Sequence, residues 1–163
     1  MWSRRGYKMP DYKLMAKQIE ALAGVCGDFL PLLSNASAVL NEGIERINWV
    51  GFYLIDNGSL LLGPFQGRPA CVRIEIGKGV CGTAVREGRL LRVEDVHRFP
   101  GHIACDSASR SEIVLPLCSG GRIVGVLDID SPERGRFSAE DEEGLSIVVS
   151  SIEACADFSR LRL

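Results

Sequence analysis

Hydrophobic positions recur with two different periods along the chain, and the changes of period predict its elements. From Asp11 to Val25 the apolar residues recur at helical spacing, and a second helical pattern follows Pro31. The last helix has the clearest signal, because Ser138 and Asp141 form a capping-box pattern ahead of an apolar stripe. The stripe consists of Leu145, Val148, Val149, Ile152 and Cys155.

Between these helices the period falls to two, which is typical of β-strands. Residues 48–55 alternate, and Asp56-Asn57-Gly58-Ser59 is a turn signal that predicts residues 60–65 as the hairpin partner. Further strands are predicted at residues 71–76, 90–93, 112–118 and 122–130, with a short helix in GKGVCGTAVREG. The pattern predicts an α+β fold, with a meander of about six mostly antiparallel strands, N-terminal helices and a C-terminal helix.

One domain of this kind accounts for the length and composition of the chain. The 163 residues are 46% apolar and 25% charged, which is typical of a single globular domain. Residues 1–10 lie outside the pattern, so we expect a flexible N-terminal extension at 1–10 and one domain over residues 11–163. Nineteen basic and 21 acidic residues give a net charge of -2, which provides no cationic field for nucleic acid.

The sequence indicates neither a membrane span nor a secretory signal. The longest apolar run, residues 50–55, is far shorter than the roughly 18 residues that a membrane span requires. The start, MWSRRGYKMP, lacks the apolar stretch of a signal peptide. We therefore expect a cytoplasmic protein, in which thiols are usually catalytic, metal-bound or inert.

Two of the six cysteines lie where their surroundings could activate a thiol. Cys105 lies in a long polar loop with His102 and Arg110 nearby, and an imidazole and a guanidinium could stabilise a thiolate. Cys81 lies in the glycine-rich turn, where a helix N-terminus and Lys78 are expected to lower a thiol pKa. Electrostatics alone therefore ranks Cys81 first as nucleophile.

The other four cysteines have less distinctive surroundings. Cys71 is expected at the start of a strand, where burial in the sheet is the common outcome. Cys26, Cys118 and Cys155 fall on predicted apolar stripes, and we expect them to pack. A zinc site is not expected, because the spacing of His97 and His102 relative to the cysteines fits no common zinc pattern.

Acidic residues form a second candidate cluster. Alternation along the strand at residues 124–130 places Asp128 and Asp130 on one face, and Glu112 opens the neighbouring strand. Clustered carboxylates raise at least one pKa, so a proton stays available near neutral pH. These residues are candidates for the wall of a polar pocket that contains a proton donor.

Two aromatic residues are candidates for an apolar wall of the same pocket. Trp49 and Tyr53 share the face of the first strand opposite Val50 and Phe52, with Gly51 leaving space between them. Packing is the more common role of such a pair. An aromatic wall would also suit a methyl thioether, because sulfur contacts aromatic edges favourably.

Six segments of the sequence resemble the free methionine-(R)-sulfoxide reductases, which are stand-alone GAF-domain enzymes. The segments are WVGFYL, ACVRIEIGKGVCGTA, VEDVH, FPGHIACD, SEIVLPL and GVLDIDSP. The resemblance extends from about Ala21 to Ala154, which is most of the chain. It implies a single GAF-like domain that reduces the free amino acid rather than protein-bound methionine sulfoxide and is recycled by thioredoxin.

The resemblance also implies a role for each candidate. Cys105 matches the cysteine that attacks the sulfoxide, Cys71 matches the resolving thiol, and Cys81 matches an alternative resolving thiol. Substrate-contacting or catalytic positions of the family are matched by Trp49, Glu112, Asp128 and Asp130. Tyr53 is assigned to the substrate pocket from its place on the strand alone.

These roles imply reduction of free L-methionine (R)-sulfoxide through a sulfenic acid and an intramolecular disulfide, with thioredoxin as external reductant. No metal or organic cofactor is expected, and a homodimer is a candidate assembly. Two alternatives are a non-catalytic GAF small-molecule sensor and a peroxide-reducing thiol enzyme. The sequence leaves open whether Cys71 or Cys81 resolves the sulfenic acid and which carboxyl donates the proton.

Overall fold

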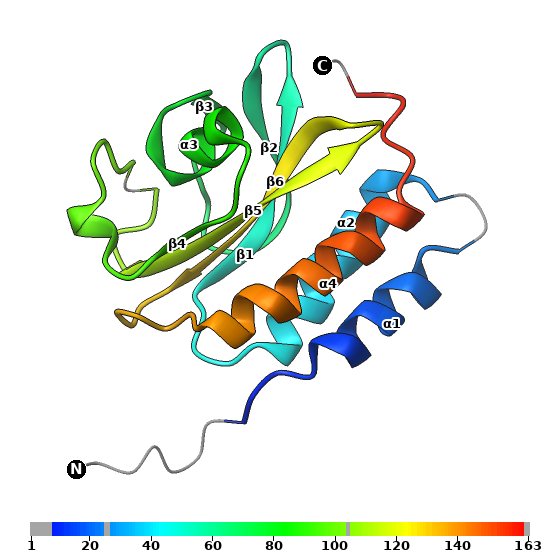
Figure 1. Ribbon diagram of the computed structural model, residues 1–163, viewed down its shortest axis with the longest axis horizontal. Coiled ribbons are helices and arrows are strands. Elements are labelled where there is room, and N and C mark those ends of the chain that lie inside the picture. The colour runs from blue at the N-terminus through cyan, green and yellow to red at the C-terminus, as the bar shows by residue number, and fades with distance from the viewer. Residues whose placement is uncertain (1–7, 25–26, 104, 162–163) are drawn as a thin grey trace.

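The computed structural model describes residues 8–24, 27–103 and 105–161, in which an antiparallel six-stranded sheet separates two layers (Figure 1). The strand order is β3-β2-β1-β6-β5-β4, and each neighbouring pair is antiparallel. The strands are β1 (Trp49–Asp56), β2 (Ser59–Gly67), β3 (Arg73–Glu75), β4 (Leu91–Val93), β5 (Ser111–Ser119) and β6 (Arg122–Ser131). The predicted α+β class is confirmed.

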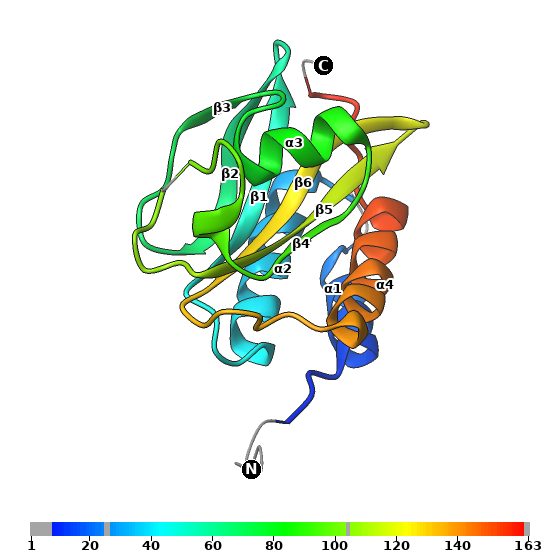
Figure 2. The same cartoon turned by 60° about the vertical axis from the view of Figure 1, so that its left-hand side comes forward.

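Helices cover the two faces of the sheet unequally (Figures 1 and 2). One face is covered by α1 (Tyr12–Leu22), α2 (Phe29–Gly43) and α4 (Ala139–Cys155). The opposite face carries α3 (Gly79–Glu87), and the 3-10 helix η1 (Val96–Arg98) lies in the loop that leads to β5. No helix in the described part of the chain has the length and apolar character needed to cross a membrane.

The predicted meander is wrong, because β1 lies at the centre of the sheet between β2 and β6. The chain leaves β3 at one edge, passes through α3 and enters β4 at the other edge. A central strand is covered on both sides, and residues 49–54 of β1 are accordingly all buried. Strong apolar character on both faces of WVGFYL is the signal of this central position.

Two predicted element boundaries need correction, and a third is confirmed by its cap. Helix α2 begins before Pro31, at Phe29, because the Asp28 side chain caps it and a proline is tolerated in a first turn that needs no N–H donor. Strand β3 has only three residues, so Cys71 precedes it and does not begin it. The capping box of Ser138 and Asp141 is present and starts α4 as predicted.

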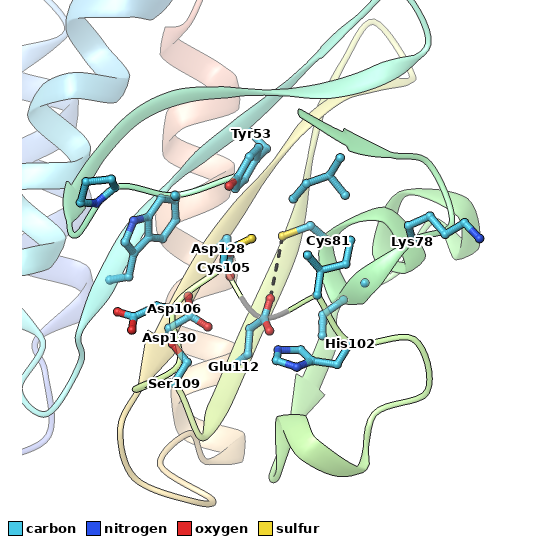
Figure 3. Close-up of a pocket in the computed structure, with 17 residues that line it drawn as sticks. Tyr53, Lys78, Cys81, His102, Cys105, Asp106, Ser109, Glu112, Asp128 and Asp130 are labelled. Atoms are coloured by element: carbon cyan, nitrogen blue, oxygen red, sulfur yellow. Dashed lines mark hydrogen bonds between the residues drawn. The ribbon is translucent and has the colours of Figure 1, made fainter. Parts of the chain in front are cut away.

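Two separate hydrophobic clusters lie on the two faces of the sheet. The larger cluster fills the space between the sheet and the helices and includes Leu33, Phe52 and Leu127. The smaller cluster lies on the α3 side and includes Trp49 and Tyr53. The candidate site residues lie on this second side, over β1, β5 and β6 (Figure 3).

Candidate active site

A pocket of about 530 Å³, counting its open mouth, lies between the sheet and α3 and brings together most of the predicted site residues. Strands β1, β5 and β6 form its floor, and α3 and the loop before β5 form its rim (Figure 3). Its predicted members are Trp49, Tyr53, Cys81, Cys105, Glu112, Asp128 and Asp130. Residues far apart in sequence therefore converge in one cavity.

A disulfide joins Cys71 to Cys105 at the edge of this pocket, with a Cα–Cα distance of 5.5 Å. Cys105 lines the pocket, whereas Cys71 lies in the segment just before β3, held where the Tyr53 hydroxyl donates a hydrogen bond of 2.8 Å to its carbonyl oxygen. The bond shows that these two cysteines can reach each other across a separation of 34 residues.

The three predicted carboxyl groups occupy one face of neighbouring strands. Glu112 on β5 lies directly opposite Asp130 on β6, and Val114 lies opposite Asp128. Val124 packs on the helix side instead, because the β5–β6 register shifts between Leu117 and Cys118. The prediction that even-numbered residues share a face is thus correct for the two aspartates and wrong for Val124.

Burial changes the acidity of these groups. Asp128 and Glu112 are only 6% and 7% exposed. Burial raises the pKa of Asp128 to about 6, although hydrogen bonds with Glu112 and Cys81 act in the opposite direction. Burial also raises the pKa of Glu112 well above its ordinary value, and the negative charges of Asp128 and Asp130 raise it further. The cluster therefore retains a proton near neutral pH.

Asp130 completes this cluster and is influenced by a fourth carboxyl group. Burial raises its pKa well above the ordinary value, followed by the charges of Asp128 and Asp106. One oxygen of Asp128, Oδ1, is buried and has no hydrogen-bond partner in the described residues. An unpaired buried acceptor is costly, so this oxygen is suited to receive a donor from a ligand.

Cys81 is a buried thiol, and its acidity is opposite to the expected one. Its Sγ donates a long hydrogen bond of 3.9 Å to Glu112 Oε1 (Figure 3). Burial raises the pKa of the thiol well above its ordinary value, and the charges of Asp128 and Glu112 raise it further. Lys78 is exposed and points away from the thiol (Figure 3), so helix position does not make Cys81 a thiolate.

The aromatic wall forms as predicted and is supported by a glycine. The rings of Trp49 and Tyr53 stack with centroids 6.0 Å apart, and Trp49 also stacks on Phe65 at 5.3 Å. A Cβ at Gly51 would lie 2.3 Å from Phe65 Cβ and 2.7 Å from the Trp49 ring. Only glycine leaves room for this arrangement, which presents apolar edges to the pocket.

The two residues that were expected to surround Cys105 with positive charge, His102 and Arg110, do not do so in the pocket. His102 lines the pocket, but burial lowers its pKa, with a smaller effect of His97, so its imidazole is favoured in the neutral form. Arg110 is exposed and does not line the pocket. Among the described residues, the group with metal-ligating geometry is Cys81, Glu112 and Asp128, within 4.8 Å of one another, and not the two histidines.

Three polar residues that shape the pocket wall carry no assignment from the sequence patterns. Asp106 and Ser109 line the pocket, and the side-chain amide of Asn48 donates to both, at 3.0 Å and 3.1 Å. The Asp106 carboxylate also accepts a hydrogen bond from the Ala108 N–H, which shapes the loop after Cys105. The Asx-turn pattern at Asp106 is the local signal that could have identified this anchor.

The three cysteines that were expected to pack behave differently from one another. Cys155 is half-buried and contacts the helix-side core, which agrees with packing. Cys118 is exposed, so its predicted packing is wrong, because the alternation of β5 turns Leu115 and Leu117 towards the helix-side core and Cys118 to the other face. Cys26 lies outside the described residues.

Comparisons with known proteins agree with this geometry. Residues 34–155 match the family model described as "GAF domain". The free methionine-R-sulfoxide reductase of Escherichia coli K12 is 54% identical over 142 residues, which are 87% of this chain and 86% of that protein. The chain also superposes on fRMsr of Staphylococcus aureus in its reduced form, with TM-score 0.88, 50% identity and coverage of 96% of this chain and 100% of that one. The S. aureus complex with substrate gives TM-score 0.88 and 50% identity over 93% of this chain and 99% of that one.

Proposed function

This chain belongs to the free methionine-(R)-sulfoxide reductases of the GAF-domain family, and on that premise we propose that it reduces free L-methionine (R)-sulfoxide to L-methionine. The observation that carries the proposal is the Cys71–Cys105 disulfide beside a buried carboxyl cluster in one pocket. A pair of thiols that can close a disulfide and a proton source are the two components that sulfoxide reduction by thiols requires.

The carboxyl cluster and the aromatic wall bind opposite ends of the substrate. The methyl thioether end lies against Trp49 and Tyr53, whose edges favour contact with sulfur. The α-ammonium pairs with carboxylate oxygens of the cluster, including the unpartnered Asp128 Oδ1. A sulfoxide that is linked within a peptide has no α-ammonium, so its entry would leave buried anions unpaired, and the pocket selects the free amino acid.

Reduction begins when the Cys105 thiolate attacks the sulfur of the bound sulfoxide. The cluster of Glu112, Asp128 and Asp130 acts as a shared acid and protonates the sulfoxide oxygen, because burial holds a proton on these groups near neutral pH. The S–O bond breaks as oxygen is transferred to the Cys105 sulfur. Methionine leaves, and Cys105 becomes a sulfenic acid.

The second half of the cycle restores the thiols. The Cys71 thiol attacks the Cys105 sulfenic acid, forms the disulfide and releases the oxygen as water. Cys71 is preferred to Cys81 as the resolving thiol because it is bonded to Cys105, whereas Cys81 is a buried thiol with a raised pKa. Thioredoxin then reduces the disulfide by supplying two electrons and two protons.

The test is thioredoxin-coupled oxidation of NADPH with free L-methionine (R)-sulfoxide, its (S) epimer and a peptide-linked sulfoxide in parallel. We expect turnover with the free (R) epimer alone. Absence of turnover with all three, from folded protein with reduced cysteines, would overturn the proposal. Hydrogen peroxide in the same assay tests the alternative of a peroxide-reducing enzyme. We expect turnover to be far faster with methionine sulfoxide than with hydrogen peroxide.

The sensor alternative has its own test. A sensor needs no redox cysteines, so a variant with serine at Cys71, Cys81 and Cys105 would retain its full response if sensing were the function. The proposal expects this variant to bind the sulfoxide without any turnover.

A further inference from the structure

We propose that the protein dithiol that recycles this enzyme docks on the apolar segment formed by Pro69, Ala70 and Val72 and attacks the sulfur of Cys71 rather than that of Cys105. This inference rests on the proposed function, because it concerns the disulfide that the reaction produces. The two sulfurs differ in what surrounds them, and this difference determines the direction of attack.

Cys105 lies on the pocket side of the disulfide. Its loop is followed by Asp106, and the pocket that it lines also contains Asp128 and Asp130. The reducing species is a thiolate, so an approach to Cys105 through the pocket meets four carboxyl groups and a single lysine, Lys78. The approach would also require a protein partner to enter a cavity that is sized for a small molecule.

Cys71 is not among the residues that line the pocket, although its neighbours Pro69 and Ala70 do line it. In the sequence around it, residues 66–72, the one charged residue is Arg68, which is exposed and cationic. A thiolate that approaches Cys71 therefore meets no acidic side chain from residues 66–72 and is attracted by the positive charge of Arg68. Electrostatics therefore favours attack on Cys71.

The segment beside Cys71 is apolar and open to solvent. Val72 is 67% exposed, the largest value among the large hydrophobic residues of the described chain. Pro69 is also exposed, and Ala70 is half-buried. A single exposed valine is ordinary, but a run of apolar side chains around a bond that a partner must reach gives that partner a contact surface.

The backbone of this segment is held by hydrogen bonds to neighbouring strands. The carbonyl of Val72 accepts a hydrogen bond of 2.9 Å from the Leu62 N–H on β2. The carbonyl of Cys71 accepts one of 2.8 Å from the Tyr53 hydroxyl. A surface that is already ordered loses little conformational freedom on docking, which favours association.

The exchange steps balance in sulfur, electrons and protons. A reductant thiolate forms a bond to Cys71 Sγ, and the Cys71–Cys105 bond breaks with its electron pair on Cys105 Sγ. The second reductant thiol loses its proton and attacks the reductant sulfur of this mixed disulfide, which releases Cys71 as a thiolate that takes up a proton. The reductant leaves as a disulfide, and the enzyme has two reduced cysteines.

Trapping of the mixed disulfide tests which sulfur is attacked. Oxidised full-length enzyme is mixed with thioredoxin in which the second active-site cysteine is serine, and the adduct is digested and mapped by mass spectrometry. We expect the adduct on Cys71, and pre-reduced enzyme as the control should trap nothing. An adduct on Cys105 would overturn the proposal, and the result does not depend on sulfoxide turnover.

The docking surface is tested by Val72→Asp, with Ile147→Asp as the matched control. Ile147 is 40% exposed on α4, on the opposite side of the molecule from the disulfide segment. We expect Val72→Asp to lower kcat/KM for thioredoxin by about tenfold. Turnover supported by dithiothreitol should fall less, because the new charge repels any thiolate whereas only the protein reductant also loses its contact surface, and the KM for sulfoxide should stay as in the wild type. The control should leave both reductants unaffected.

Two results would overturn the docking surface. One is unchanged kcat/KM for thioredoxin in Val72→Asp. The other is an equal loss with thioredoxin and dithiothreitol, since that loss would not arise from protein docking. Failure of the proposed function is distinguishable, because wild-type enzyme would then turn over no sulfoxide with either reductant.

Discussion

The two faces of the sheet perform different tasks with the same strands. On β6, Leu127 and Ile129 are fully buried against the helices, whereas Asp128 and Asp130 point into the pocket on the other face. The helix side contains apolar side chains that stabilise the fold. The pocket side contains buried carboxyl groups and thiols, whose burial destabilises their charged forms.

Stability and chemistry are therefore separable in this molecule, because they depend on opposite faces of the sheet. Three helices close the first face, while a short helix and a loop cover the second and leave a cavity. Substitutions on the helix side should therefore change the free energy of unfolding with little effect on the catalytic step. Substitutions on the pocket side should do the opposite.

The largest expected effect is the loss of chemistry from the pocket side in Cys105→Ser. A serine cannot form the sulfenic acid, so we expect turnover of free methionine (R)-sulfoxide to fall by more than about 10⁴-fold. The thioredoxin-coupled assay measures this loss. Cys118→Ser is the matched control, because Cys118 is exposed on β5 outside the pocket, and it should keep wild-type turnover. Substantial turnover by Cys105→Ser would contradict the assigned nucleophile.

The next effect is on stability and comes from the helix side. Leu33→Ala removes a side chain that is fully buried between α2 and the sheet, so we expect unfolding to become easier by about 3 to 4 kcal/mol. Urea denaturation gives this value. Leu30→Ala on the same helix, where Leu30 is 54% exposed, should change stability by less than about 0.5 kcal/mol. If the folded Leu33→Ala enzyme also lost kcat, by a factor that corresponds to a similar free energy, the two faces would not act separately.

A smaller effect on stability should have the opposite sign on the pocket side. In the unfolded chain Asp128 titrates near 3.8, whereas burial raises its pKa to about 6 in the folded protein. Between these values the folded state holds a proton that the unfolded state has released, so stability falls as pH rises from about 4 to about 6. Asp128→Asn removes this loss, and we expect it to stabilise the ligand-free protein at pH 7.5 by about 1 to 3 kcal/mol while activity falls.

Thermal unfolding at several pH values measures this change. The curve of Tm against pH should be flatter for Asp128→Asn than for the wild type between about pH 4 and 6. Glu143→Gln, on the exposed surface of α4, is the control and should retain the wild-type curve. A destabilised Asp128→Asn protein at pH 7.5 would show that the carboxylate stabilises the fold.

The smallest expected effect concerns Cys81, which lies on the pocket side but outside the disulfide. Cys81→Ser retains a donor for Glu112 in altered geometry, so we expect turnover to fall by about two- to tenfold. After one turnover without reductant, peptide mapping should still find the Cys71–Cys105 disulfide. Cys71→Ser is the contrasting variant, in which a sulfenic acid at Cys105 should be trapped by dimedone. Loss of the disulfide in Cys81→Ser would make Cys81 the resolving thiol.

Most elements of the fold could be predicted, because hydrophobic periodicity reports which side of a helix or strand is covered. The capping box of α4 and the hairpin of β1 and β2 follow from local signals at Ser138 and at Asn57-Gly58. The order of the strands in the sheet could not be predicted, and the expected meander is wrong. The order depends on pairing between β1 and β6, which are more than 60 residues apart in the sequence.

The candidate site divides in the same way. Alternation alone placed Asp128 with Asp130 and Trp49 with Tyr53 on the correct faces. The acidity of Cys81 was predicted with the wrong sign, because a helix N-terminus is a local property and burial beside Asp128 is not. Asn48 was not assigned for a similar reason, since its partners Asp106 and Ser109 come from a loop 58 to 61 residues away.

Which side chains share a face follows from the sequence alone, because the two-residue period of a strand and the 3.6-residue period of a helix are properties of the local backbone. The sequence also determined the family, through motifs that extend over most of the chain. The packing of separate elements brings Cys71 within bonding reach of Cys105 and gathers three carboxyl groups in one pocket, and no local pattern indicates either. Distance and burial depend on how separate elements pack, and these two quantities control thiol exchange and proton affinity.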